Sequence, residues 1–96
     1  MQDKPVQYTI TYHYLVLKDD VALLNRDMLE RIKTAIENRL KTSPEMYGVR
    51  LRKSLKDYWK LRVGDYRIVF SIIGNHIRIL AIRHRKEVYG FVIGRR

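Results

Sequence analysis

The stretch that decides the fold runs from Tyr58 to Ile82 and reads YWKLRVGDYRIVFSIIGNHIRILAI. Its β-branched and aromatic residues fall into three alternating runs, as strands of a half-buried sheet do. The three strands that we expect span residues 58–63, 66–72 and 77–82. Between them stand Gly64-Asp65 and Gly74-Asn75, pairs that supply the positive φ of two-residue hairpin turns. The stretch therefore predicts an antiparallel meander.

A further strand is expected near the N-terminus, where Val6 to Tyr14 reads VQYTITYHY. Apolar and polar residues alternate along this segment, as in a strand with one buried face. Pro5 is tolerated at the start of such a strand. We interpret His13 as an ordinary residue of the polar face.

Two helices are expected between this strand and the meander. The first places its apolar residues on one face, at Leu17, Val21 and Leu24. The second begins at the N-cap Asp27, with Glu30 completing a capping box, and ends before Pro44. Its apolar stripe consists of Met28, Ile32, Ala35, Ile36 and Leu40. Charged outer faces indicate that both helices cover a sheet.

The expected elements follow the order β-α-α-β-β-β within one domain that spans residues 1–96. This order predicts an α+β fold with two N-terminal helices packed on an antiparallel meander sheet. Residues 45–56 are expected to form a loop with a short strand or turn near 49–51. The tail, residues 83–96, is expected to pack as a last turn or strand.

The composition excludes several classes of protein. The 96 residues include no Cys and three scattered His, which argues against disulfide scaffolds, thiol catalysis and zinc sites. No apolar run reaches the 18 residues of a membrane span, and residues 1–6 do not resemble a signal peptide. We therefore expect a cytoplasmic protein without membrane contact, metal or other cofactor.

The net charge of +10 lies entirely in the second half of the chain. Residues 1–45 hold seven basic and seven acidic residues, whereas residues 46–96 hold thirteen basic and three acidic ones. A concentrated positive field is typical of a protein that binds a polyanion or an acidic protein. The alternative is a surface whose charge only keeps the protein soluble.

Alternation along the meander places several cations on one face of the sheet. This face holds Lys60, Arg62, Arg67 and, at the strand end, Arg83, with Tyr58 and Tyr89 nearby. Adjacent like charges destabilise a sheet, but Arg and Lys bind phosphate and Tyr can stack on a base. We therefore assign RNA or phosphate binding to Arg52, Lys53, Lys56, Tyr58, Arg62, Arg85 and Lys86. The alternative is a solvated polar face.

The basic half lacks the paired carboxylates of metal-dependent nucleases and any glycine-rich phosphate loop. A metal-free route remains for RNA, whose 2′-hydroxyl can attack the adjacent phosphate. A protein then has to align the backbone, move two protons and stabilise charge on the phosphorane. Lys, Arg and Tyr can do this. His84, between Arg83 and Arg85, is a second candidate for proton transfer or else a bystander.

Two stretches, YWKLRVGDYRIVF (residues 58–70) and AIRHRKEVY (residues 81–89), carry a family resemblance. The first resembles the basic strand, glycine turn and arginine-bearing strand of the RelE/ParE toxin superfamily of bacterial and archaeal toxin–antitoxin modules. The second resembles the C-terminal signature of the same superfamily. The likeness spans nearly the whole chain, although the first half matches only in pattern. It implies a microbial-RNase-like fold.

The RelE branch of this superfamily consists of endoribonucleases that cut mRNA in the ribosomal A site and are blocked by a RelB-like antitoxin. The resemblance implies that Arg67 holds the scissile phosphate and stabilises its transition state. It implies Arg83 as general acid or phosphate ligand, and Tyr89 as the residue that orients the substrate. Tyr58 stands where the best-known RelE pattern has a second lysine, so Lys60 is the first candidate for general base and His84 the second.

Three functions remain open on this basis. The ParE branch has the same fold but poisons DNA gyrase and lacks the nuclease residues, whereas a basic RNA-binding module would bind without cleaving. Because this chain has Lys60, Arg67, Arg83 and Tyr89, we favour the mRNA-cleaving toxin. An antitoxin with acidic and apolar surface is the expected partner, besides mRNA and the ribosome. Its expected docking points are Leu15, Leu23 or Leu29.

Overall fold

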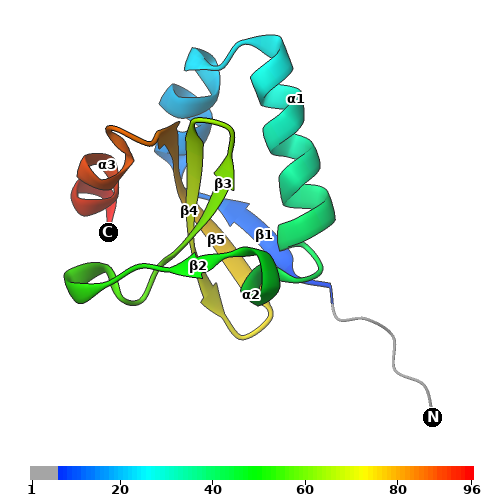
Figure 1. Ribbon diagram of the computed structural model, residues 1–96, viewed down its shortest axis with the longest axis vertical. Coiled ribbons are helices and arrows are strands. Elements are labelled where there is room, and N and C mark those ends of the chain that lie inside the picture. The colour runs from blue at the N-terminus through cyan, green and yellow to red at the C-terminus, as the bar shows by residue number, and fades with distance from the viewer. Residues whose placement is uncertain (1–6) are drawn as a thin grey trace.

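A computed structural model describes residues 7–96 as a five-stranded sheet with helices on both faces (Figure 1). Its strands are β1 (Thr9–Tyr12), β2 (Val49–Arg50), β3 (Trp59–Val63), β4 (Tyr66–Ile73) and β5 (His76–His84). They lie in the order β1-β5-β4-β3-β2. The predicted α+β class and the three-stranded meander are confirmed. The short strand expected near residues 49–51 is β2, which pairs antiparallel with β3.

The sheet is mixed, which corrects the expectation of an antiparallel sheet, because β1 runs parallel to β5. The two helices of the N-terminal half bring the chain back to the sheet, as parallel strands and crossovers require. The strand predicted from Val6 to Tyr14 is also shorter than expected. Val6 and Pro5 lie outside the described residues, and pairing with β5 ends at Tyr12.

The first helical region consists of two short turns, η1 (Val16–Asp20) and η2 (Val21–Leu23). Of the expected apolar face, Val21 and Leu24 pack against the core, whereas Leu17 is 60% exposed and the buried side chains of η1 are Val16 and Asp20. The turn η1 is π-helical, and its wider i→i+5 hydrogen bonding shifts which residues face the sheet. An acidic side chain therefore lies inside the molecule.

The second helix, α1 (Arg26–Ala35), continues into the π-helical turn η3 (Ile36–Leu40). Its N-cap is Asn25, whose side-chain oxygen accepts the Met28 N–H at 2.8 Å, and this corrects the expectation that Asp27 is the cap. Asp27 instead lies in the first turn, where its charge complements the helix dipole. The predicted stripe is confirmed, since Ile32, Ala35, Ile36 and Leu40 are buried against the sheet.

Two short elements lie in the segment expected to be a loop, α2 (Pro44–Tyr47) and the 3-10 turn η4 (Lys53–Leu55). Gly48, between α2 and β2, allows a close approach. A Cβ at this position would come within 2.8 Å of the Phe70 ring and of the Pro44 carbonyl oxygen. The chain can therefore pass directly over the core at this point.

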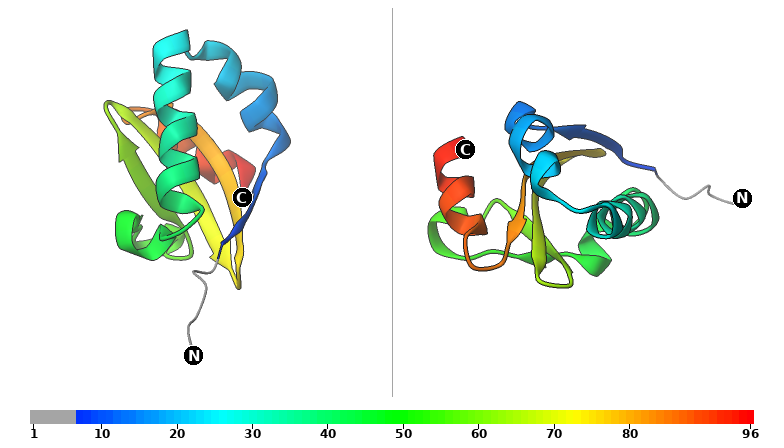
Figure 2. Two further views of the ribbon diagram at one scale, coloured as in Figure 1. Left: turned by 90° about the vertical axis from the view of Figure 1, so that its right-hand side faces the viewer. Right: turned by 90° about the horizontal axis from the view of Figure 1, so that it is seen from above.

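The C-terminal tail forms a helix, α3 (Val88–Arg95), and the expectation of a turn or strand is wrong. Two glycines give this segment a low helix propensity, but burial of Val88 and Val92, four residues apart, offsets it. The helix α3 covers the face of the sheet opposite α1, and the view from above shows the sheet between the two helices (Figure 2). It packs on Val69, Leu80 and Ala81.

A β-bulge interrupts the pairing of β4 with β5. Val69 pairs with Ala81 and Phe70 pairs with Ile79, so Leu80 is skipped. Beyond the bulge the alternation changes sides: Ile79 and Ile82 both belong to the cluster under α1, whereas Leu80 and Ala81 face α3. The simple alternation expected for 77–82 is therefore wrong after Ile79, and the bulge re-aims the end of β5.

Candidate active site

Three arginines form a row across the middle of the sheet. Arg62 of β3 lies opposite Arg67 of β4, and Arg67 lies opposite Arg83 of β5. Residues opposite each other share a face, and this face is the one that α3 covers. Arg83 reaches it because of the bulge at Leu80. We refer to Arg62, Arg67 and Arg83 as the arginine row.

Lys60 and Tyr89 lie beside the arginine row. Lys60 is two residues before Arg62 on the same strand, and its register partner is Val69. The Lys60 Nζ donates to the Tyr89 Oη at 3.4 Å, so the start of α3 brings a phenol to the lysine. Both side chains are half-buried. A potential base and a hydroxyl thus stand within hydrogen-bond distance of each other next to a row of cations.

Arg67 is held at the β3–β4 turn. Its Nη1 donates to the Gly64 carbonyl at 3.1 Å and to the Tyr66 carbonyl at 2.9 Å. No ion pair with an acidic residue is found for Arg67 within residues 7–96. Its charge is therefore available to an anion that approaches this face.

Arg83 is the most restrained member of the row, and its side chain is 11% exposed. Its Nε donates to Asp20 Oδ1 at 2.8 Å, and its Nη1 lies 3.3 Å from Glu87 Oε1. The guanidinium also stacks on the Phe91 ring, with its carbon 3.8 Å from the ring centre. These contacts determine where the charge lies and which way its plane faces.

Asp20 is a site neighbour that the sequence analysis did not identify. Its carboxylate is buried and also accepts two hydrogen bonds from Arg95, at 2.8 and 2.9 Å. Burial raises the pKa of Asp20, but hydrogen bonds from Arg95, the Ile82 N–H and Arg83 outweigh burial and hold it below its ordinary value. The signal in the sequence was its spacing. Asp20 stands four residues after the apolar Val16, so the two side chains share one face of a helical segment.

His84 lies on the other face of the sheet from the Lys60–Tyr89 pair, although it lines a small pocket together with Arg83 and Asp20. It pairs with Tyr66, one position along from the Arg67–Arg83 pair, and therefore lies on the opposite face. Its ring packs edge-on against Tyr66 at 5.9 Å, and its Nδ1 accepts the Lys86 N–H at 3.2 Å. The geometry favours Lys60 over His84 as the base.

His13 is buried, which corrects its assignment to a polar face. The strand β1 ends one residue earlier, and the turn into η1 carries the ring inward. Its Nδ1 accepts the Leu15 N–H at 3.1 Å. Burial, together with the charges of Arg78 and Arg95, lowers the pKa of His13 below its ordinary value of 6.5.

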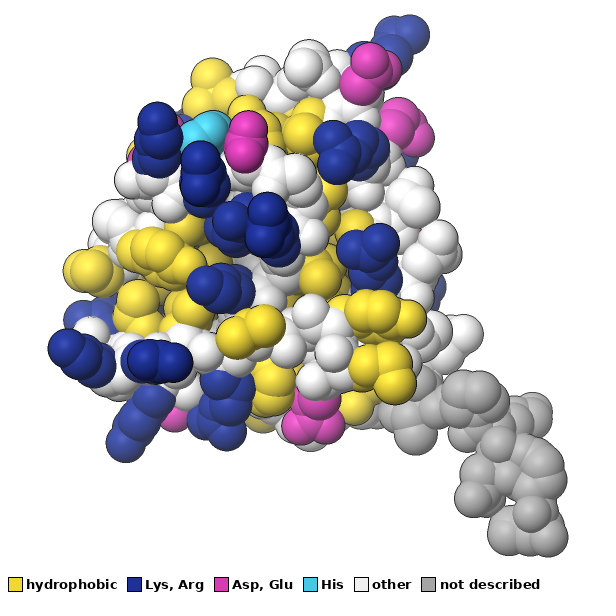
Figure 3. All heavy atoms as spheres, viewed as in Figure 1, with side chains coloured by type: hydrophobic (Ala, Val, Ile, Leu, Met, Phe, Trp, Pro, Cys, Tyr) yellow, Lys and Arg dark blue, Asp and Glu magenta, His cyan; other side chains and the backbone are white. Residues whose placement is uncertain are grey.

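The remaining cations predicted to bind RNA surround the site. Lys and Arg side chains gather over β3 and β4 between α1 and α3, and again around η4 (Figure 3). Those predicted from the flanking segments are all exposed: Arg52, Lys53, Lys56, Arg85 and Lys86. Arg85 lies 3.7 Å from Asp65, which partly neutralises it. Tyr58 is half-buried and packs against the apolar residues under α3.

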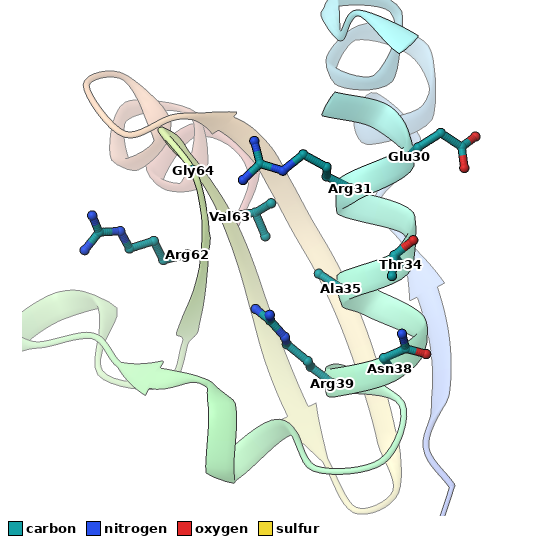
Figure 4. A pocket seen from close by; sticks show the side chains of 9 residues that line it. All are labelled: Glu30, Arg31, Thr34, Ala35, Asn38, Arg39, Arg62, Val63 and Gly64. Carbon is teal, nitrogen blue, oxygen red and sulfur yellow. The ribbon is translucent and has the colours of Figure 1, made fainter. Parts of the chain in front are cut away.

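A second basic feature is a groove of about 450 Å³ between α1 and β3 (Figure 4). Arg31 of α1 and Arg39 of η3 reach toward the sheet, whereas Arg62 points away from α1. This groove was not predicted from the sequence, because Arg31 and Arg39 belong to the half of the chain without net charge.

Within residues 7–96 no group of His, Asp and Glu could hold a metal ion. In the same range, no helix has the length and apolar character needed to cross a membrane.

Comparisons with known proteins were made for sequence and structure. The family model described as "ParE toxin of type II toxin-antitoxin system, parDE" matches residues 8–89. No curated protein matches the chain.

Among solved structures, the toxin–antitoxin complex RelBE2 from Mycobacterium tuberculosis is 27% identical, with a TM-score of 0.76, over 88% of this chain and 98% of that one. The RelB-RelE antitoxin–toxin complex from Methanococcus jannaschii is 26% identical, with a TM-score of 0.65, over 83% and 95%. A mutant of the toxin RelE from E. coli in the free state is 22% identical, with a TM-score of 0.72, over 93% and 97%, and shares the fold.

Proposed function

The chain belongs to the ParE toxin family of type II toxin–antitoxin systems, within the RelE/ParE superfamily, and on this premise we propose that it is an endoribonuclease that cleaves mRNA in the ribosomal A site. The observation that carries the proposal is the arginine row, with the Lys60–Tyr89 pair beside it on the same face. Such a cluster of cations destabilises a sheet unless an anion approaches it. A phosphodiester is that anion.

The proposed reaction uses the RNA's own nucleophile. Lys60 takes the proton from the 2′-hydroxyl, whose oxygen forms a bond to the adjacent phosphorus. The bond from phosphorus to the 5′-oxygen then breaks, and that oxygen takes a proton from Arg83 or from water, so the products are a 2′,3′-cyclic phosphate and a 5′-hydroxyl. Arg67 stabilises the extra charge of the pentacoordinate phosphorane. DNA lacks the 2′-hydroxyl and does not react.

Arg83 and Tyr89 complete the site in this proposal. Arg83 binds the phosphate or gives the proton to the leaving oxygen, and Tyr89 orients the nucleotide while its Oη holds the Lys60 amine. The exposed cations of the η4 segment and of the turn after β5 bind neighbouring phosphates. Tyr58 offers a ring on which a base can stack.

The proposed partner that controls the toxin is an acidic RelB-like antitoxin. RelB-RelE and RelBE2 are toxin–antitoxin complexes, and the net charge of this chain calls for an acidic counterpart. Of the docking points expected from the sequence, Leu23 is 67% exposed, whereas Leu15 and Leu29 are half-buried. Leu23 is therefore the strongest of the three.

Purified protein added to translating ribosomes tests the proposed activity. Mapping of the mRNA ends should show cuts within the A-site codon, each with a 2′,3′-cyclic phosphate on the upstream fragment. The same preparation of Arg67→Ala is the control for contaminating nuclease. Intact mRNA with the wild-type protein would contradict the proposal.

A second candidate function is poisoning of DNA gyrase. The observation in its favour is that the matching family model describes ParE toxins. The two functions separate cleanly in one experiment, because a gyrase poison traps covalent gyrase–DNA complexes and leaves mRNA intact. Trapped complexes that do not depend on Arg67 would support this candidate.

A further inference from the structure

The Asp20 side chain lies at the outer edge of β5, at the end of the arginine row. Pairing of β1 with β5 ends at Tyr12 and Ile79, and side chains serve the edge beyond that point. Asp20 Oδ2 accepts the Ile82 N–H at 2.9 Å, and Arg95 donates to the Leu80 carbonyl at 3.1 Å. These two side chains therefore form the hydrogen bonds to the β5 backbone that a neighbouring strand forms elsewhere. They do so at the part of β5 that carries Arg83.

Asp20, Glu87, Arg83 and Arg95 form one cluster of two negative and two positive charges. Arg95, whose side chain is 3% exposed, forms a bidentate pair with the fully buried Asp20 carboxylate. That pair has no net charge. Arg83 uses only its Nε in the contact with Asp20. Asp20 and the exposed Glu87 thus hold Arg83 through its Nε and its Nη1, and Asp20 is the buried one of these two anchors.

The contacts also restrict how the Arg83 guanidinium can move. Arg67 lies directly opposite in the sheet, and the two like charges repel each other. Asp20 holds the Nε from the side away from β4, and Phe91 holds the plane of the group at 3.8 Å. Within residues 7–96 no hydrogen bond engages the Nη2. One donor of a fixed guanidinium therefore remains for a ligand.

We propose that Asp20 is a positioning residue, which holds the Arg83 guanidinium in the arginine row so that it meets an RNA phosphate without first rearranging. The inference rests on the proposed function and extends it to a residue 40 positions before Lys60. A buried ion cluster contributes little to stability compared with apolar packing. A charge fixed in advance, by contrast, speeds a reaction in which charge develops.

A mutant cycle between Asp20 and Arg83 tests the proposal on translating ribosomes. We expect Asp20→Asn to lower kcat on the order of 10- to 100-fold and to weaken the binding of RNA by a smaller factor. In an Arg83→Ala background the same substitution should change kcat by less than about twofold, because its effect passes through Arg83. A merely structural role would lower kcat equally in both backgrounds, and that result would overturn the proposal.

Ile36→Ala is the matched control, because Ile36 of η3 is buried in the core cluster on the face of the sheet opposite the arginine row. It should lower Tm as Asp20→Asn does but keep kcat at temperatures well below Tm. If Asp20→Asn does not fold, Arg83→Lys replaces it in the test. This variant keeps the charge and the Asp20–Arg95 pair but loses the Nε donor, and wild-type kcat in it would overturn the proposal.

Binding separates this inference from the proposed function. The probe is a single-stranded RNA with 2′-O-methyl riboses, which cannot be cleaved, and the readout is fluorescence anisotropy. If the wild-type protein cleaves no mRNA, yet Asp20→Asn weakens binding only when Arg83 is present, the proposed function fails and the positioning role stands. If the loss of affinity is the same with and without Arg83, or absent, the positioning role fails.

Discussion

The two faces of the sheet differ although the same strands build both. Toward α1, the meander strands present apolar residues that pack with the helix, among them Ile68 and Phe70. Toward α3, the apolar cluster is small and is flanked by Lys60 and the arginine row. Burial of apolar surface stabilises by roughly 25 cal/mol per Å², whereas adjacent like charges destabilise. Stability thus comes mainly from the α1 face, and the proposed chemistry belongs to the α3 face.

The largest effect is expected from Phe70→Ala on the α1 face. Phe70 is fully buried, and such truncations cost about 3–5 kcal/mol because they leave a cavity. Denaturant unfolding should show this loss, while cleavage per folded molecule stays near that of the wild type. A fully stable variant, or a folded one without activity, would break the proposed division between the faces.

Arg67→Ala should have the opposite effect. Within residues 7–96 the side chain makes hydrogen bonds only to the Gly64 and Tyr66 carbonyls, so Tm should change by no more than a few degrees. Loss of one group that stabilises the transition-state charge should lower kcat on the order of 10²–10³-fold, or about 3–4 kcal/mol. Single-turnover cleavage of mRNA on ribosomes measures this directly. Unchanged cleavage would remove the arginine row from the mechanism.

Tyr89→Phe should have a smaller effect within the same face. It removes the hydroxyl that accepts from Lys60 and keeps the ring that packs under α3. Loss of this one hydrogen bond of 3.4 Å should lower kcat by roughly tenfold, which is about 1.4 kcal/mol. A fall as deep as that of Arg67→Ala would show that the phenol takes part in proton transfer instead of orienting Lys60.

The smallest effect concerns the pH dependence of stability at His13. Because the folded state lowers the pKa of His13, the unfolded chain binds the proton first as pH falls below 6.5. The free energy of unfolding should therefore be highest above pH 6.5 and decrease as pH falls toward the folded-state pKa. His13→Asn keeps an acceptor for the Leu15 N–H and should flatten this decrease. An identical pH profile in the variant would contradict it.

Much of the fold could be predicted because its strongest signals are local. The strands expected at 58–63, 66–72 and 77–82 correspond to Trp59–Val63, Tyr66–Ile73 and His76–His84. Alternation and turn glycines are local properties of the chain. The parallel pairing of β1 with β5 and the helix α3 were missed, because both depend on contacts with residues far away in the sequence.

The site residues also divide into those whose position follows from local patterns and those whose position depends on tertiary packing. Placement of Lys60, Arg62 and Arg67 on one face follows from alternation on two strands joined by a tight turn. Arg83 was placed near them only through its position at a strand end, and His84 was grouped with it although it faces the other way. The bulge at Leu80 decides that Arg83, and not His84, shares the face of Arg67.

By itself, the sequence determined the meander, the apolar stripe of α1 and the concentration of charge in the second half. The reason is that backbone alternation and helical periodicity depend on a few neighbouring residues. The net charge of a segment depends only on which residues it contains. Only the tertiary structure decided that the bulge at Leu80 turns Arg83 toward Arg67, and that a buried Asp20, 63 residues earlier, holds it there. Both outcomes depend on how three distant segments pack, and no local pattern encodes that.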